Sequence, residues 1–342
     1  MKQAYTTDNK VTHLSDEIDV NEKLGNIIGE KFVKYRKRWD EVHDNFLETE
    51  FPLFLQIHPN QSCNYKCPHC LLGVEEIKNN YQEKSLSQSL FKNIVDEGKD
   101  FNCPSISIQG WNEPFYMKKI FDYIEYADKS NYIDIMLNSN GSLLDEDKIN
   151  RILNSGLTRI RFSMDAATES TYKKVRLESG FDEIKHNISK LVEMRDKGGY
   201  KLPLVGVSFC EISTNTHEKD LFIETWSEIV DFVSIQTFMP PVHNKVYDKF
   251  YTEEQTLNLN IPPKFHCPQP FERVDIHGDK IFPCCYYDSK DLAIGTFPET
   301  TIYQAWNSEK AKEIRDIHRK GEYQKISNCD KCVKSTFGVL NY

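Results

Sequence analysis

Short apolar runs alternate with amphipathic stretches between Pro52 and Thr237, and this alternation constrains the fold more than any other feature of the chain. The predicted strands are residues 53–58, 105–109, 133–138, 159–164, 204–210 and 232–237. The predicted helices between them are residues 87–99, 117–129, 146–154, 181–197 and 219–229. Such a pattern predicts βα units with a parallel sheet. Periodicity alone does not separate a doubly wound sheet from a partial barrel.

The regions on either side of this pattern differ from it in character. Residues 1–50 are polar and are predicted to be helical from Val20 to Phe46, so we expect a helical N-terminal extension. Residues 241–342 contain half of the cysteines and are predicted to form a linker and a small cysteine-rich domain. The barrel or sheet domain then covers residues 51–240, in agreement with the size of typical domains.

Composition limits the classes of partner. The net charge of −9 argues against a nucleic-acid partner, because phosphate backbones are bound through clustered Lys and Arg. No run approaches the roughly 20 apolar residues that cross a bilayer, and the first residues lack the basic and apolar segments of a signal peptide. We therefore expect a soluble, cytoplasmic protein without a membrane partner, in which cysteines serve as metal or redox ligands rather than disulfides.

Three cysteines lie close together directly after the first predicted strand. Cys63, Cys67 and Cys70 have C-x3-C-x2-C spacing. Iron–sulfur clusters are usually held by four thiolates, so three thiolates hold three corners of a [4Fe-4S] cluster and leave one iron open. The alternative is a structural zinc site with His69 as the fourth ligand.

Polar turns follow the next three predicted strands. Glu113 lies in the turn Gly110-Trp111-Asn112-Glu113-Pro114, and the two turns after it contain Asn138 and Asn140, then Ser163 and Asp165. Because the carboxyl ends of parallel strands lie at one edge, we expect these turns to share a site with the cysteine loop. Cys210, at the end of the fifth strand, lies at the same edge.

The cysteine loop and the three turns, in this order, resemble the radical S-adenosylmethionine enzymes. The resemblance implies a partial (β/α)6 TIM-like barrel in which the open iron binds S-adenosylmethionine (SAM) and reductive cleavage yields a 5'-deoxyadenosyl radical. That radical abstracts a hydrogen atom from the substrate. The resemblance covers about residues 51–333, and it departs from the family at Trp111, where relatives usually have Gly.

The same resemblance implies roles for individual residues. Glu113 would receive the amino group of SAM, and the segments with Asn138, Asn140, Ser163 and Asp165 would line its ribose and carboxylate. Arg176 matches an arginine directed at the carboxylate, although a surface salt bridge with Glu178 or Glu169 is the alternative. His69 would pack on the adenine side.

A second group of cysteines lies in the last 80 residues. A hairpin predicted at residues 273–282 would bring Cys267 toward Cys284, and the predicted helical stretch 302–318 would return Cys329 and Cys332 to them. Four thiolates close a cluster without a vacant iron. This set resembles the twitch or abbreviated SPASM extension of 2-deoxy-scyllo-inosamine-type dehydrogenases, which implies an auxiliary [4Fe-4S] cluster. Cys285 is the alternative to Cys284, which we prefer because it follows Pro283, and a zinc site with four cysteine ligands is the alternative to the cluster.

The two groups together suggest a reaction. We expect dehydrogenation of a small polar substrate, a sugar or aminosugar, with the auxiliary cluster as electron acceptor and a flavodoxin- or ferredoxin-type electron donor. Alternatives are a radical epimerase that uses Cys210 or Cys285 as hydrogen donor, a peptide-modifying SPASM enzyme, and a metal-binding scaffold without catalysis. Candidates for the base are His58, His69, Glu211, Glu218 and His243.

Overall fold

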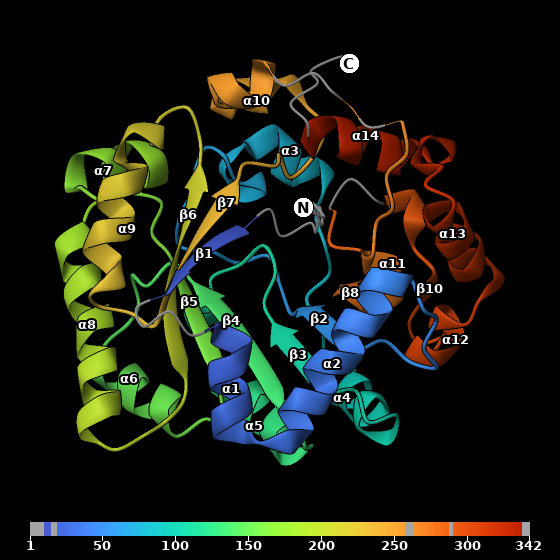
Figure 1. The fold of residues 1–342 in the computed structure, drawn as a ribbon, viewed down its shortest axis with the longest axis horizontal. Coiled ribbons are helices and arrows are strands. Elements are labelled where there is room, and N and C mark those ends of the chain that lie inside the picture. Colours follow the sequence, from blue (N-terminus) through green and yellow to red (C-terminus); the bar gives the residue numbers. More distant parts are fainter. Residues whose placement is uncertain (1–9, 15–18, 258–260, 262, 287–289, 337–342) are drawn as a thin grey trace.

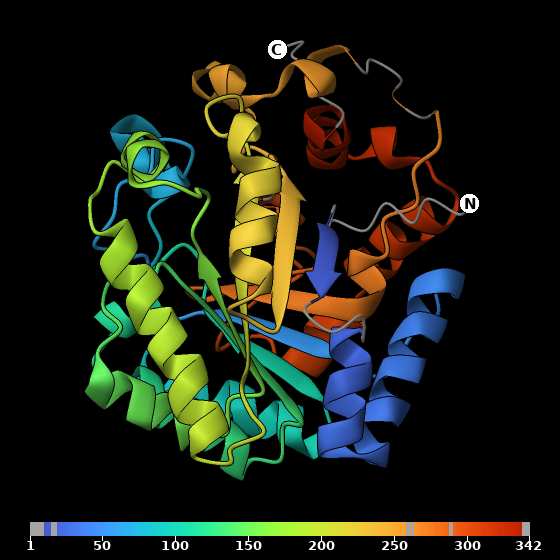
Figure 2. The same cartoon turned by 60° about the vertical axis from the view of Figure 1, so that its left-hand side comes forward.

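The computed structural model describes residues 10–14, 19–257, 261, 263–286 and 290–336. Six consecutive strands form its parallel centre: β2 (Phe54–His58), β3 (Ser105–Ile108), β4 (Asp134–Ser139), β5 (Arg159–Ser163), β6 (Leu204–Glu211) and β7 (Phe232–Thr237). They lie in the order β7-β6-β5-β4-β3-β2, each beside the next along the chain. The sheet curves but does not close (Figures 1 and 2), so the partial-barrel prediction is confirmed.

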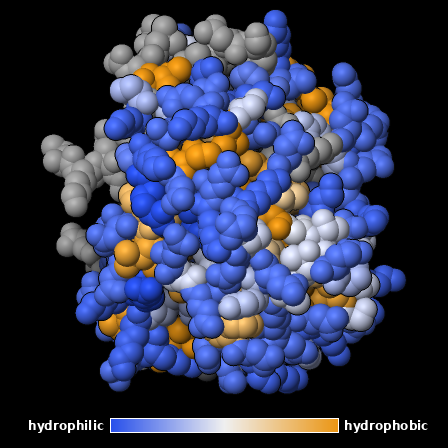
Figure 3. Space-filling view, turned by 90° about the vertical axis from the view of Figure 1, so that its right-hand side faces the viewer, coloured by the Kyte–Doolittle hydropathy of each residue, from blue (hydrophilic) through white to orange (hydrophobic). Residues whose placement is uncertain are grey.

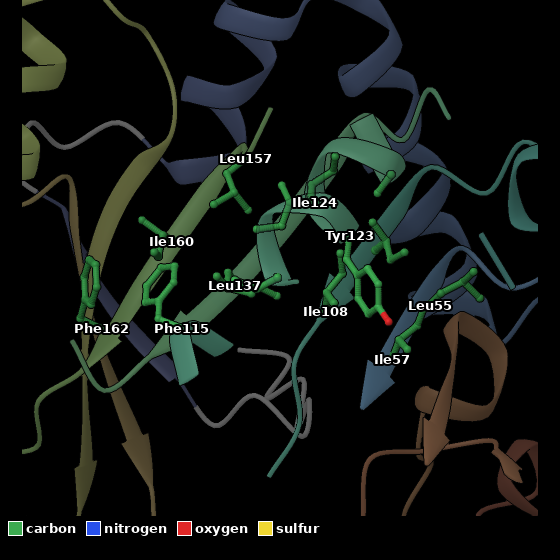
Figure 4. Packing of buried hydrophobic residues seen from close by; sticks show 14 of the residues in the cluster. Leu55, Ile57, Ile108, Phe115, Tyr123, Ile124, Leu137, Leu157, Ile160 and Phe162 are labelled. Atoms are coloured by element: carbon green, nitrogen blue, oxygen red, sulfur yellow. The ribbon is translucent and has the colours of Figure 1, made fainter. Parts of the chain in front are cut away.

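Helices cover the outer face of this sheet. They are α4 (Gln88–Asp100), α5 (Ile120–Lys129), α6 (Glu146–Leu153), α7 (Glu169–Arg176), α8 (Phe181–Lys197) and α9 (Lys219–Ser227). Alternate strand residues point outward and pack against these helices, and Figure 4 shows part of this core, with Ile57, Ile108, Leu137 and Ile160 among the labelled side chains. The remaining strand positions face the lumen of the barrel. Helix α7 was absent from the sequence prediction.

The N-terminal region differs in part from its prediction. Helices α1 (Val20–Ile28) and α2 (Glu30–Asn45) replace a single helix, because Gly29 has φ +91°, outside the helical region. The extension is not entirely helical. Strand β1 (Lys10–Leu14) pairs antiparallel with β7 and extends the sheet beyond the last barrel strand.

The C-terminal region joins the opposite end of the same sheet. After α10 (Glu253–Leu257) and α11 (Gln269–Glu272), strand β8 (Arg273–His277) pairs in parallel with β2. The predicted hairpin is present: β8 turns at Gly278 (φ +60°) into β9 (Lys280–Phe282), which pairs with the short β10 (Gly295–Thr296). Helices α12 (Ile302–Trp306), α13 (Glu309–Arg319) and α14 (Ser327–Thr336) follow, and α12 lies beside β10 in Figure 1.

The surface over this part of the molecule is mainly hydrophilic. Figure 3 shows the face on the right-hand side of Figure 1, where hydrophobic residues form separate patches. Among the residues that the structure describes, no helix has the length and apolarity that a membrane span requires.

Candidate active site

The first cysteine loop follows β2 and faces a cavity of about 420 Å3 at the carboxyl ends of the strands, here called the cysteine cavity. Cys63, Cys67 and Cys70 all line it. A backbone hydrogen bond from Cys70 N to Cys67 O (3.0 Å) shapes the loop, and Gly73 completes it. A Cβ at Gly73 would lie 1.9 Å from Cys67 O, so any side chain there would displace the loop. Spacing alone did not reveal this requirement for glycine.

The donor chemistry of the loop suits a metal cluster. Burial raises the pKa of Cys63 to about 11 and that of Cys70 to about 12, so these thiols stay protonated at neutral pH until a metal displaces the protons. Three sulfur atoms on one concave loop fit three corners of a [4Fe-4S] cluster. His69, the fourth zinc ligand considered from the sequence, has its Nε2 3.6 Å from Asp165 Oδ2.

Glu113 lies at the end of β3, almost fully buried, and accepts three hydrogen bonds. The donors are Ser139 Oγ (2.8 Å), Asn140 N (2.7 Å) and Phe115 N (3.0 Å). Burial raises its pKa to about 6, although these hydrogen bonds favour the carboxylate. Glu113 therefore connects the second and third strand ends, and it lines the cysteine cavity beside Trp111.

Gly110 begins the same turn for a steric reason. A Cβ there would lie 1.9 Å from His58 Nδ1, so the histidine at the end of β2 leaves room only for glycine.

The two asparagines of the next turn have different partners. Asn138 faces the lumen, and its amide oxygen accepts from Arg161 Nη2 (2.9 Å) and Gln109 Nε2 (2.8 Å) in the orientation that satisfies these groups. Asn140 Nδ2 donates to Asn64 Oδ1 (2.9 Å), and thereby ties this turn to the cysteine loop. Both asparagines line the cysteine cavity.

Arg176 is buried beside the cysteine loop, and the surface salt bridge with Glu178 or Glu169 considered from the sequence is wrong. Its Nη2 lies 2.6 Å from Asp165 Oδ2 and donates to the Ser163 carbonyl oxygen (2.6 Å), and its Nη1 donates to Cys67 Sγ (3.5 Å). Asp165 has a left-handed backbone (φ +55°), which carboxylate residues tolerate better than most. Asp165 Oδ1 also accepts from Cys210 N (2.7 Å).

Asp165 therefore connects the ends of β5 and β6 and carries the charge opposite Arg176. Although burial opposes ionisation, Arg176 and His69 hold the pKa of Asp165 below its ordinary value. Burial raises the pKa of Cys210 well above that of an ordinary thiol, so the side chain is a neutral S–H group. Cys210 lines the cysteine cavity together with Ser163, Asp165 and His69.

Most of the candidate bases have other partners. His58 lies in a buried cluster with Asp275 (3.4 Å), Glu218 caps the segment after β5, Glu211 pairs with Lys219, and His243 contacts Ser335. Of the candidates, His69 lines the cysteine cavity.

The second cysteine group surrounds another cavity, here called the auxiliary cavity. It is lined by Cys267, Cys284, Cys285, Cys329 and Cys332, which come from the segments before α11, after β9 and on α14. Burial raises the pKa of Cys267, Cys284, Cys329 and Cys332, to about 12 for Cys329. Five sulfur atoms on one cavity exceed the four that a cubane cluster needs.

Two neighbours distinguish members of this second group. Cys285 is tied to Gln269, whose Nε2 donates to Cys285 Sγ (3.3 Å) and whose Oε1 accepts from Cys285 N (2.9 Å). His318 Nε2 lies 3.3 Å from Cys329 Sγ, and this histidine is buried. Neither Gln269 nor His318 was predicted, because nothing in the local spacing connects them to the cysteines.

The two cysteine groups share a wall. Thr237, Phe238 and Met239, at the end of β7, line both the cysteine cavity and the auxiliary cavity. The two sets of candidate cluster ligands therefore line cavities that have one short segment in common.

Comparisons with known proteins agree with this division. The Radical SAM superfamily model matches residues 57–206, and the SPASM iron-sulfur cluster-binding domain model matches residues 267–333. Similar curated proteins include a GTP 3',8-cyclase from Desulforamulus reducens, 29% identical over 188 residues that cover 55% of each chain. A GTP 3',8-cyclase from Clostridium perfringens is 24% identical and covers 78% of this chain and 84% of its own length. The match to the first of these relatives spans little more than half of its length.

Solved structures share the fold at low sequence identity. The structure of anSMEcpe with bound AdoMet has a TM-score of 0.58 and 16% identity, over 82% of this chain and 88% of its own. BtrN in complex with AdoMet has a TM-score of 0.52 and 16% identity, over 84% of this chain and 94% of its own. At this identity the likeness concerns the fold alone.

Proposed function

The chain is a radical SAM enzyme with a C-terminal SPASM-type iron–sulfur domain, and from this premise we propose that it oxidises a small polar substrate by removing hydrogen. When bound, the first cluster and SAM supply a 5'-deoxyadenosyl radical that abstracts one hydrogen atom. Cys63, Cys67 and Cys70 would hold that cluster. Cys267, Cys284, Cys329 and Cys332 would hold the auxiliary cluster.

The protein residues around the cysteine cavity position SAM. Glu113 offers carboxylate oxygens to its amino group, which suits an ammonium donor. Arg176, paired with Asp165, supplies positive charge beside the cysteine loop. Asn138, Asn140, Ser163 and His69 also line the cysteine cavity. The first three would offer hydrogen bonds to the ribose and carboxylate of SAM, and His69 would lie on its adenine side.

The shared wall of Thr237, Phe238 and Met239 is the observation that carries the proposed reaction type. Oxidation of an alcohol or amine removes a hydrogen atom, a proton and one further electron. The auxiliary cavity shares this segment with the cysteine cavity, and a cluster held there would be the electron acceptor that the chain offers. Its surplus of cysteines favours a closed cluster, which receives electrons, over an open one that binds substrate.

We propose a sugar or aminosugar as substrate and a flavodoxin- or ferredoxin-type protein as electron donor. Polar lining of the cysteine cavity by Gln109, Ser208 and Gln236 supports a hydroxylated substrate. A second candidate is radical cyclisation of a guanine nucleotide, which the similarity to GTP 3',8-cyclases favours.

The test begins with anaerobic reconstitution of the full chain. We expect about eight irons per chain, and release of 5'-deoxyadenosine from SAM after reduction by dithionite. Cys63→Ala should abolish that release. Bound zinc in place of iron, with SAM left intact, would end the enzyme hypothesis.

A panel of sugars, aminosugars and GTP then separates the reaction types. A product that has lost two hydrogens supports dehydrogenation. Conversion of GTP to an isomeric cyclised product would replace dehydrogenation with the second candidate.

A further inference from the structure

The lumen of the barrel is polar rather than filled with branched apolar side chains. Inward positions of TIM-like barrels usually carry Val, Ile and Leu in packed layers. Here the outward positions are apolar, and the inward ones lining the cavities are polar along most of the sheet. These inward residues are Gln56, Ser107, Gln109, Asn138, Arg161, Ser163, Ser208, Ser234 and Gln236.

A third cavity, of about 530 Å3 and here called the lumen cavity, lies among these residues and extends to helices α1 and α2. It shares Gln109, Asn138 and Arg161 with the cysteine cavity. The two cavities therefore meet at these three side chains. A molecule bound beside SAM has a polar path from the strand ends into the barrel.

Four arginines line the lumen cavity, and their positions differ. Arg159 pairs with Asp134, Arg273 with Asp275, and Arg36 lies 3.9 Å from Asp40, at the end formed by α2. Asp19 and Asp40, the carboxylates in the cavity wall, belong to this N-terminal end.

Arg161 lies instead where the cavities meet, with its guanidinium against the Asn138 amide oxygen at 2.9 Å. Of the four arginines that line the lumen cavity, Arg161 is therefore the one that also lines the cysteine cavity.

Three buried polar atoms of residues that line the lumen cavity have no hydrogen-bond partner among the described residues. They are Ser107 Oγ, on a side chain that is 2% exposed, Arg36 Nε and Asn21 Oδ1. Buried polar groups in native proteins are nearly always hydrogen-bonded, to protein, water or ligand. Their presence indicates a wall built for a polar occupant.

We propose that the substrate extends into the barrel and carries an anionic group, a carboxylate or a phosphate, that Arg161 binds. A planar guanidinium donates two parallel hydrogen bonds to either group, which a lysine does not. The inference rests on the proposed function, because it assigns a chemical class to the substrate of that same site. It changes the expected substrate from a sugar or aminosugar without an acidic group to a sugar acid, a sugar phosphate or another acidic metabolite.

The test measures binding rather than turnover. The full chain, reconstituted with clusters and SAM, is titrated calorimetrically with inorganic phosphate and, separately, with acetate. We expect saturable binding of at least one anion, weakened tenfold to a hundredfold, as an order of magnitude, by Arg161→Gln. Arg161→Lys should retain part of the affinity. The matched control is Arg38→Gln, since Arg38 is largely exposed on α2; it should leave binding unchanged.

The outcomes separate the explanations. Preference for phosphate or for acetate identifies the anionic group. The proposal is overturned by absence of saturable binding up to about 10 mM, by unchanged binding in both Arg161 variants, or by an equal loss in Arg38→Gln. Release of 5'-deoxyadenosine from SAM by the wild-type protein without added anion reports the proposed function separately, so either idea can fail without the other.

Discussion

The buried ion pair between Asp165 and Arg176 allows a quantitative prediction. In Asp165→Asn the side chain keeps its shape, and asparagine tolerates the left-handed backbone at φ +55° as well as aspartate does. The amide oxygen still accepts from Cys210 N. The amide NH2 group replaces the oxygen that lies 2.6 Å from Arg176 Nη2, so a donor faces a donor and the guanidinium becomes an unpaired buried cation.

The expected cost follows from burial. Asp165 is 2% exposed and Arg176 7% exposed, so solvent screens the pair little. Removing one partner of a buried ion pair costs about 3–5 kcal/mol in the free energy of unfolding. The ion pair between Lys197 and Glu193 is exposed and screened by solvent, so Glu193→Gln should change the free energy of unfolding little and serves as the control. Asp165→Asn combined with Arg176→Met should cost less than the sum of the single changes, because the double variant leaves no unpaired charge.

Urea unfolding of the variants, compared in the same cofactor state, measures these differences. Because the folded-state pKa of Asp165 is held below 3.8, the carboxylate stabilises the fold above that value and loses its contribution as the pH falls through the lower folded pKa. The difference in the free energy of unfolding between wild type and Asp165→Asn should therefore be largest near pH 7 and become smaller in acid. A cost below about 1 kcal/mol at pH 7, or additive single changes, would refute the reasoning.

Four further predictions concern Gly110 at the start of the turn with Glu113, the cysteines and His318 around the auxiliary cavity, and the hydrogen removed from the substrate. Gly110→Ala should lower the melting temperature and weaken SAM binding, because its Cβ would overlap the His58 ring; calorimetry measures both, and an unchanged protein contradicts the contact. Cys284→Ser should lose about four of the about eight irons per chain, whereas Cys285→Ser should keep them, because Gln269 already donates a hydrogen bond to Cys285. Iron analysis measures both variants, and the opposite result would make Cys285 the ligand in place of Cys284. His318→Ala should lower the reduction potential of the auxiliary cluster by about 60 mV, the one-electron equivalent of a lost charge-assisted hydrogen bond to Cys329, without moving that of the first cluster in an EPR titration. Turnover in heavy water should yield a product that has lost two hydrogens and carries no solvent deuterium at the reacting carbon, whereas a stereoisomer of the substrate with one deuterium in place of one hydrogen would indicate epimerisation.

The sequence predicted the strands of the barrel because each has a clear apolar pattern between turn signals, as in residues 105–109 and 159–164. It missed β1, since five residues such as Lys10–Leu14 become a strand only by pairing with β7, more than 200 residues away. It also predicted one helix across Gly29, where the backbone has a positive φ and α1 ends before α2 begins.

The candidate site was predictable where its chemistry is local. The C-x3-C-x2-C loop and the turn with Glu113 are contiguous in sequence, so their residues could be named. The sequence did not decide whether Arg176 binds the SAM carboxylate or forms a surface salt bridge. Arg176 lies on helix α7, which was not predicted, and its partner Asp165 precedes that helix. The position of Arg161 at the meeting of two cavities depends on sheet curvature, which no local pattern encodes.

The pairing of β8 with β2 limits how the protein can be divided. A chain that ended after Thr237 would retain every ligand of the first cluster, yet it would expose the backbone N–H and C=O groups of Phe54–His58 that now bond to β8. Open strand edges of this kind recruit other chains and promote aggregation. The radical-generating half should therefore prove insoluble alone, and exchange of the C-terminal region between relatives should succeed only when the replacement brings its own first strand in the same register.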